Sequence, residues 1–233
     1  MFAFSNFTNT TKMETMNESP NDLIDNPTPR CPVALVVDTS GSMSGQPIEQ
    51  LNAGIQLFID ELKRDDLARW SVDLAVYTAG GSADCIQSFI GIEQIAGVAP
   101  LDASGGTPLG QATRIALDDL EARKKSYRDA GVPYYQPWLV LISDGAPGDH
   151  WLDAAQRAAA LSAKRKLVSL PIGVQGADFE ILSQFSSKPA VALDGLKFRE
   201  LFQWLSASMA RVSASTSSDA SVQLPSIDSW GSV

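Results

Sequence analysis

The sequence contains little cysteine, and its apolar residues nowhere form a long uninterrupted run. Its two cysteines, Cys31 and Cys85, are too few for a disulfide framework and lack the CxxC spacing of a metal or redox pair. No stretch approaches the ~20 apolar residues that a membrane-spanning helix needs. Residues 1–7 lack the basic start and apolar core of a secretory signal. We therefore expect a cytoplasmic protein with no membrane partner, in which both cysteines are buried or incidental thiols.

Basic residues are also scarce. The formal net charge is -9, from 27 acidic and 18 basic residues, and Lys and Arg never gather into a long block, which argues against a nucleic acid partner. Of the 233 residues, 44% are hydrophobic and 19% are charged. This balance is typical of a globular protein with one domain of roughly 180 residues and tails.

Composition divides the chain into three parts. Residues 1–30 are rich in Asn, Thr, Ser and Pro without sustained periodicity, so they are interpreted as a flexible leader. Residues 31–213 are expected to form the domain. Residues 214–233 are a Ser-rich tail, interpreted as disordered because its few apolar residues bury too little surface to offset the entropy of ordering. The alternative is a tail that docks on the domain through Leu224, Ile227 and Trp230.

Strands and helices are expected to alternate within the domain. Residues 33–37 and 138–142 are continuous apolar runs, typical of strands that are buried on both faces of a parallel sheet. The other predicted strands are residues 71–78, 85–90, 167–174 and 190–193. The order βαββαβαβαβα predicts an α/β fold with a doubly wound, Rossmann-like, mostly parallel sheet, one antiparallel edge strand and helices on both faces.

Prolines and one aspartate mark where several of these elements begin or end. Pro47 and Pro108 are expected to open the first and second helices, because proline suits the first helical turn. Asp149 is expected to cap the third helix. Pro171 cannot donate to a sheet ladder, so we expect it at the end of its strand or at a bulge.

Three loops at the carboxyl edge of the predicted sheet carry oxygen ligands. The candidate metal ligands are Asp38, Ser40 and Ser42 after the first strand, Thr107 before the second helix, and Asp144 after residues 138–142. Open α/β sheets bind ligands at this edge, and oxygen donors suit a hard cation such as Mg²⁺ or Mn²⁺. Because three of the five donors are neutral hydroxyls, the bound cation would keep enough positive charge to accept a carboxylate from a partner protein.

Each of these residues also has an ordinary structural interpretation. Ser40 and Ser42 suit turns and helix caps, and Thr107 before a proline suits the start of a helix. Asp144 with the glycine that follows it is a common turn pair. The metal site is predicted by the combination of all five residues on three neighbouring loops.

A metal-dependent hydrolase or phosphatase is the alternative from another functional class. A Ser-His-Asp mechanism has only His150 as a base, and Met43 interrupts a Gly-x-Ser-x-Gly elbow. A phosphatase of the Asp-x-Asp type would need a second aspartate where Ser40 stands. No phosphate-binding Gly-Lys-Ser/Thr loop is present, so no enzyme activity is expected. A third alternative is a structural scaffold in which the metal is only a staple.

The motifs resemble those of a known family. Residues 33–45, VALVVDTSGSMSG, are similar to the first segment of the metal-ion-dependent adhesion site of von Willebrand factor A domains. Within that superfamily the chain most resembles the bacterial tellurite-resistance TerY-like family. The segments that carry this resemblance are Gly105-Gly106-Thr107 with Leu109-Gly110, Ser143-Asp144-Gly145 with Pro147, and the helix at 198–212.

The resemblance covers residues 33–213 and implies a site and a role. It implies that Asp38, Ser40, Ser42, Thr107 and Asp144 hold one divalent cation. It also implies a protein-binding function in a bacterial stress-response or tellurite-resistance system, with a Ser/Thr kinase and a phosphatase as partners. The loop at 78–84 is smaller and richer in glycine than the family pattern, so the shape of the binding face is expected to differ.

Overall fold

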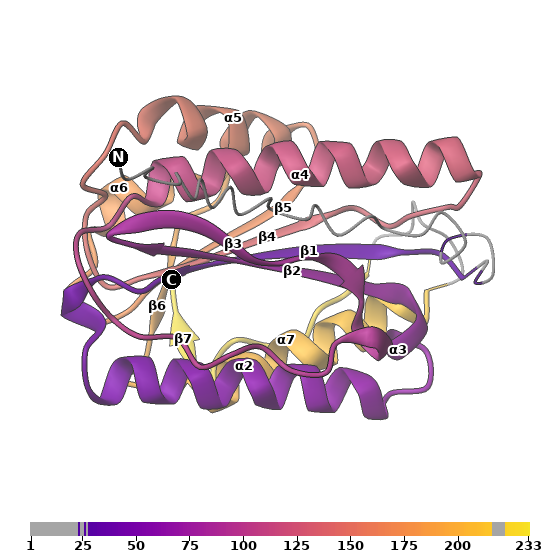
Figure 1. Ribbon diagram of the computed structural model, residues 1–233, viewed down its shortest axis with the longest axis horizontal. Coiled ribbons are helices and arrows are strands. Elements are labelled where there is room, and N and C mark those ends of the chain that lie inside the picture. The colour runs from indigo at the N-terminus through magenta and orange to yellow at the C-terminus, as the bar shows by residue number, and fades with distance from the viewer. Residues whose placement is uncertain (1–22, 24–25, 27, 216–221) are drawn as a thin grey trace, which may run out of the picture.

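The computed structural model describes residues 23, 26, 28–215 and 222–233. They form one central sheet with helices on both faces (Figure 1). Helices α4 (Leu109–Ala130) and α5 (Leu152–Ala163) cover one face, and α2 (Gln46–Arg64) and α7 (Phe198–Ser213) cover the other. The shorter elements are the helices α3 (Ala68–Ser71) and α6 (Phe179–Ser183) and the 3-10 turns η1 (Gly41–Met43) and η2 (Ile92–Gln94).

The sheet has the strand order β3-β2-β1-β4-β5-β6-β7. In chain order the strands are β1 (Cys31–Asp38), β2 (Val72–Gly80), β3 (Ser82–Gly91), β4 (Trp138–Ser143), β5 (Val168–Gly173), β6 (Val191–Leu193) and β7 (Gly231–Ser232). Neighbouring strands in the series β2-β1-β4-β5-β6 pair in parallel, and β3 pairs antiparallel with β2. The predicted α/β fold is therefore confirmed, and the structure adds the short helix α3 and the strand β7 to the predicted order of elements.

The two edges of the sheet are both antiparallel, although only one antiparallel edge strand was expected. At the edge formed by β3, the register with β2 shifts between Leu74 and Val76 and again between Val76 and Tyr77. At the opposite edge, the short β7 pairs antiparallel with β6. This second edge strand lies within residues 214–233, whose composition predicts a disordered tail.

Every residue of β1 is buried, and successive side chains enter opposite layers of the core. Val33, Leu35 and Val37 belong to the core on the side of α2 and α7. Ala34 and Val36 belong to the core on the side of α4 and α5. Because both faces are covered, apolar residues are favoured at every position of the strand, and this explains the uninterrupted apolar run in the sequence.

The strand order reverses between β1 and β4, which are neighbours in the sheet but distant in the chain. The chain leaves β1 toward α2 on one face and leaves β4 toward α5 on the other. The loops after these two strands therefore diverge, and open α/β sheets bind their ligands at such a point. Asp38 ends β1 and Ser143 ends β4, so both lie at this switch point.

Pro171 lies inside β5, so the expectation that it ends the strand or forms a bulge is wrong. Val168 and Val174 both donate their N–H groups to the β4 side of the sheet. Along a strand, successive residues direct their backbone N–H groups to alternate sides. Because Pro171 is an odd number of residues from both valines, its nitrogen faces away from β4. On that side β6 begins only opposite Ile172. The missing N–H of proline therefore removes no ladder hydrogen bond.

The end of the predicted leader takes part in the fold. Leu23 is buried against Tyr127 and Val132, and Arg30 is 2% exposed. The guanidinium of Arg30 lies 3.3 Å from the carboxylate of Asp73 in an ion pair. The domain therefore extends before residue 31, because a buried arginine and an apolar side chain upstream of that point contact it. The rest of the leader lies outside the described residues.

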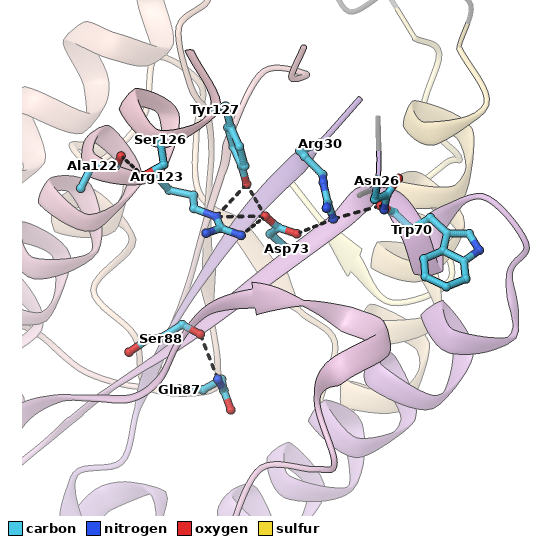
Figure 2. Close-up of polar contacts among 10 residues, drawn as sticks. All are labelled: Asn26, Arg30, Trp70, Asp73, Gln87, Ser88, Ala122, Arg123, Ser126 and Tyr127. Carbon is cyan, nitrogen blue, oxygen red and sulfur yellow. Dashed lines mark hydrogen bonds and ion pairs between the residues drawn. The ribbon is translucent and has the colours of Figure 1, made fainter. Parts of the chain in front are cut away.

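Asp73 is the centre of a buried polar cluster at the amino edge of the sheet (Figure 2). Besides Arg30, its carboxylate accepts hydrogen bonds from Arg123 of α4, with Nη2 at 2.6 Å, and from the hydroxyl of Tyr127 at 2.5 Å. Burial, followed by the nearby charge of Asp73, raises the pKa of Tyr127 well above its usual value. The cluster thus joins β2, α4 and the segment before β1 through one fully buried carboxylate.

Residues 222–233 are docked on the domain, so the interpretation of this part of the tail as disordered is wrong. Trp230 is fully buried, with its ring centroid 5.3 Å from that of Trp204 on α7. The indole N–H of Trp204 donates to the carbonyl of Pro225 at 2.9 Å. Leu224 and Ile227 pack on the same core. A few well-placed apolar side chains outweigh the polar average composition of the segment.

We predict that Trp230→Ala lowers the free energy of unfolding by about 3–5 kcal/mol, because it empties a fully buried site. Trp70→Ala is the matched control. Trp70 is 43% exposed, so its replacement should cost less than about 1 kcal/mol. Chemical denaturation of both variants measures the difference. Similar small losses in both would show that the C-terminal segment contributes little to stability.

Candidate functional site

The loops that follow β1 and precede α4 are joined backbone to backbone at the carboxyl edge of the sheet. The N–H of Gly41 donates to the carbonyl of Gly105 at 3.0 Å, and the N–H of Ser104 donates to the carbonyl of Thr39 at 2.8 Å. The first loop turns through η1, where the N–H of Met43 bonds to the carbonyl of Ser40 at 3.0 Å. These bonds hold the loop of Ser40 and Ser42 next to the loop of Thr107.

The glycine-rich turn between β2 and β3 presses against both loops. Gly105 has a φ of +69°, and a Cβ there would lie 2.5 Å from the Cα of Gly81. A Cβ on Gly80 would lie 2.2 Å from the carbonyl oxygen of Thr39. The N–H of Gly81 donates to the carbonyl of Gly106 at 2.8 Å. Only glycine permits this close approach of the backbones, which explains why the segment at 78–84 consists of small side chains around two consecutive glycines.

A chain of hydrogen bonds joins the first and third loops through their side chains. The carboxylate of Asp38 accepts the N–H of Ser40 at 2.8 Å and the hydroxyl of Ser143 at 2.5 Å. The hydroxyls of Ser40 and Ser42 are 2.9 Å apart. Ser42 then donates to the carboxylate of Asp144 at 2.8 Å. Four of the five predicted ligands therefore belong to one continuous polar cluster.

Ser143 is a further member of this cluster, in addition to the five predicted ligands. The register of the sheet pairs Val37 with Ile142, so Asp38 and Ser143 are the next residues along two neighbouring strands. A hydroxyl at the end of the strand beside a buried aspartate is the signal that could have identified it.

The backbone of Thr107 joins its loop to the loop that follows β4. Its carbonyl accepts the N–H of Leu109 and the N–H of Gly148, each at 2.9 Å. Its side chain is half-buried, and among the described residues no hydrogen bond links its hydroxyl to the cluster. The structure therefore places the loop of Thr107 beside the other two, while the hydroxyl itself is not part of the hydrogen-bonded chain.

The two carboxylates differ in their surroundings. Asp38 is fully buried, and both of its oxygens accept hydrogen bonds. Asp144 is half-buried. Burial raises the pKa of Asp144, the hydrogen bond from Ser42 lowers it, and the negative charge of Asp38 raises it again, for a net shift upward. A cation between the two would relieve the repulsion that contributes to this shift.

The donor set fits a hard divalent cation. It consists of two carboxylates and three hydroxyls, and Mg²⁺ and Mn²⁺ prefer oxygen ligands of this kind. Among the described residues, no group of three or more His, Cys, Asp and Glu side chains lies together as a metal site. A cation here would therefore depend on the hydroxyls of Ser40, Ser42 and Thr107, with Asp38 and Asp144 supplying the negative charge.

Asp149 does not cap the third helix as expected. Its carboxylate accepts the N–H groups of Gly110 and Gln111, in the first turn of α4. The residue before α5 is Trp151, which makes no side-chain cap. The loop after β4 is folded back over the start of α4, where free N–H groups are available to the carboxylate.

His150, the base that a Ser-His-Asp hydrolase would require, lies on this same loop. Its side chain is exposed, and its carbonyl accepts a hydrogen bond from Arg114 at 2.5 Å. Within the described part of the chain, no hydrogen bond joins its ring to a serine hydroxyl. In this part of the chain, His150 is therefore not hydrogen-bonded as the base of a Ser-His-Asp mechanism.

Comparison with known proteins supports the fold. The family model described as von Willebrand factor type A domain matches residues 33–203. No curated protein matches the sequence. Three similar solved structures are 13–15% identical to this chain, so they bear on the fold alone.

These three structures illustrate the range of similar proteins. The ArnB paralog VWA2 from Sulfolobus acidocaldarius has 13% identity and a TM-score of 0.52, with 77% of this chain and 45% of that chain covered. Proximal thread matrix protein 1 from the mussel byssus has 15% identity and a TM-score of 0.55, with 78% and 48% covered. The pilus adhesin SpaC from Lactobacillus rhamnosus GG has 13% identity and a TM-score of 0.63, with 78% and 30% covered. This chain thus spans less than half the length of each.

We predict that Gly105→Ala destabilises the protein more than Gly131→Ala does. Both glycines have a φ of +69°, but nothing lies within 4 Å of a Cβ on Gly131. Alanine at either position costs about 1–2 kcal/mol for its backbone conformation. The contact with Gly81 should add about 1–3 kcal/mol in Gly105→Ala alone. Thermal and chemical unfolding measure the difference, and equal losses would contradict the close approach of the loops.

Proposed function

Because the chain belongs to the von Willebrand factor type A domain family, we propose that it is a cation-dependent protein-binding module. Domains of this family often mediate protein–protein interactions. The observation that carries the proposal is the chain of hydrogen bonds from Asp38 through Ser40 and Ser42 to Asp144. It gathers oxygen donors from two loops at the switch point of the sheet.

The ligand set favours a cation that remains open to an acidic partner. One Mg²⁺ or Mn²⁺ would be held by Asp38, Ser40, Ser42, Thr107 and Asp144. Two ionised carboxylates balance the charge of a divalent cation, whereas a cage of three or four would make the loaded site negative and repel another carboxylate. An aspartate or glutamate of the partner would complete the coordination.

The proposed partners are a Ser/Thr kinase and a phosphatase in a bacterial stress-response or tellurite-resistance system. This part of the proposal rests on the sequence resemblance to the TerY-like family, which includes the helix at 198–212. We also propose a cytoplasmic location, because the two cysteines, Cys31 and Cys85, are too few for a disulfide framework. In the described part of the chain, no helix is long and apolar enough to cross a membrane.

A non-enzymatic role fits the site better than hydrolysis does. Two of the similar structures are named as a matrix protein and a pilus adhesin. The hydroxyls of Ser40 and Ser42 bond to each other, and Ser42 also bonds to the carboxylate of Asp144. Among the described residues, neither hydroxyl bonds to a histidine. The chemistry proposed for the site is therefore ligand binding.

We predict that Asp144→Asn weakens Mg²⁺ binding at least tenfold, because it removes one of the two charges that hold the cation. Asp38→Asn should do the same. It is preferable to Asp38→Ala, which leaves the buried N–H of Ser40 and the hydroxyl of Ser143 without an acceptor and costs about 1–3 kcal/mol of stability. Asp102→Asn is the control, because Asp102 is exposed in the segment that leads to Thr107. Calorimetric titration measures the affinities, and unchanged binding in both site variants would exclude this site.

We predict that binding of an acidic partner requires both the cation and Thr107. Purified candidate kinase and phosphatase partners should bind the wild-type protein in Mg²⁺ and be released by a chelator. Thr107→Ala should weaken the complex about tenfold or more, because it removes a hydroxyl oxygen that would bind the cation. Ser126→Ala, which removes a hydroxyl that bonds within α4 to the carbonyl of Ala122, is the control. Binding that survives both the chelator and Thr107→Ala would favour a scaffold in which the cation is only a staple.

A further inference from the structure

We infer that Asp149 is a positioning residue for the candidate cation site, because it holds the loop of Asp144 against the loop of Thr107. Arg114 of α4 assists it, and the two residues are called the Asp149 clamp below. The inference rests on the proposed cation-binding function and extends it to residues that contact neither the cation nor the partner.

The carboxylate of Asp149 binds the start of α4 directly. It accepts the N–H of Gly110 at 3.0 Å and the N–H of Gln111 at 2.7 Å. These donors lie in the turn that follows Thr107, while Asp149 lies on the loop that begins at Asp144. One side chain therefore ties the second ligand loop to the third.

Arg114 closes the clamp from the next turn of α4. It donates to the carbonyl of His150 at 2.5 Å and to the carboxylate of Asp153 at 2.9 Å. Its guanidinium also lies 3.9 Å from the carboxylate of Asp149. Arg114 thus binds the chain at His150 and Asp153, just after Asp149. The loop is therefore attached to α4 at more than one point.

The backbone of the two loops is in direct contact beneath these side chains. A Cβ on Gly110 would lie 2.4 Å from the Cα of Trp151, so the loop packs on α4 where only a glycine fits. The N–H of Gly148 donates to the carbonyl of Thr107 at 2.9 Å. The Asp149 carboxylate lies between these backbone contacts in the chain and adds to them, so its loss should loosen the loop that orients Thr107 relative to Asp144.

The charge of Asp149 also favours a nearby cation. The start of α4 carries the positive end of the helix dipole, equivalent to about half an elementary charge, close to the Thr107 loop. Pro108 makes no side-chain cap, and α4 has no acidic residue in its own first turn. Asp149 supplies the missing negative charge from outside the helix, so the helix terminus repels the cation less.

The test compares two aspartates that both accept N–H groups at a helix start. Asp178 accepts the N–H of Ile181 at the start of α6, so Asp178→Ala should lose a cap without losing a hydrogen bond to the ligand loops. Asp149→Ala should weaken Mg²⁺ binding by about 10–100-fold, the range seen when outer supports of metal ligands are removed. Asp149→Asn keeps the size and one acceptor oxygen but not the charge, so its affinity should fall between those of the wild type and Asp149→Ala. Calorimetric titration of the full chain with Mg²⁺ alone gives all four affinities.

Hydrogen exchange of the cation-free protein gives an independent readout. In Asp149→Ala, the amides of Gly148 and Gly81, which bond to the carbonyls of Thr107 and Gly106, should exchange faster than in the wild type and in Asp178→Ala. Wild-type Mg²⁺ affinity in Asp149→Ala, or an equal loss in Asp178→Ala, would overturn the inference. A wild-type protein that binds no Mg²⁺ would refute the proposed function instead. In that case unchanged exchange in Asp149→Ala overturns the positioning role, and faster exchange supports it.

Discussion

The buried carboxylate of Asp38 is the constraint on which the carboxyl edge of this sheet depends. A fully buried charge is costly unless hydrogen bonds replace its water, and Asp38 obtains them from the N–H of Ser40 and the hydroxyl of Ser143. The first bond lies at the entry to η1, directly after β1. The second joins the ends of the neighbouring strands β1 and β4. One buried side chain therefore contacts both the turn that presents the serines and the neighbouring strand.

Local patterns predicted the features that depend on neighbouring residues. The strands β1 and β4 are buried on both faces, so apolar side chains fill them without interruption, and the loop from Asp38 to Ser42 places its donors within one turn. The role of Asp149 was predicted wrongly, because a polar residue between a strand and a helix suits a local cap equally well. Its real partners, Gly110 and Gln111, are brought close only by the packing of α4 beside α5.

The two ends of the domain were misjudged for a related reason. Average composition suggested a flexible leader and a disordered tail, but composition does not weigh a single well-placed side chain. Arg30 meets Asp73 in a buried cluster, and Trp230 fills a site beside Trp204. In both cases the partner lies far away in the sequence, so no local periodicity reveals it.

The edges of the sheet bear on how the protein behaves when it is concentrated. Exposed strand edges can pair with strands of other molecules and begin aggregation. Here the edge strand β3 carries polar side chains such as Ser82, Asp84 and Gln87, and its register with β2 is irregular. The opposite edge, β7, offers only two residues for pairing. Neither edge presents a long, regular, apolar ladder among the described residues, so the sheet is protected against edge-to-edge growth.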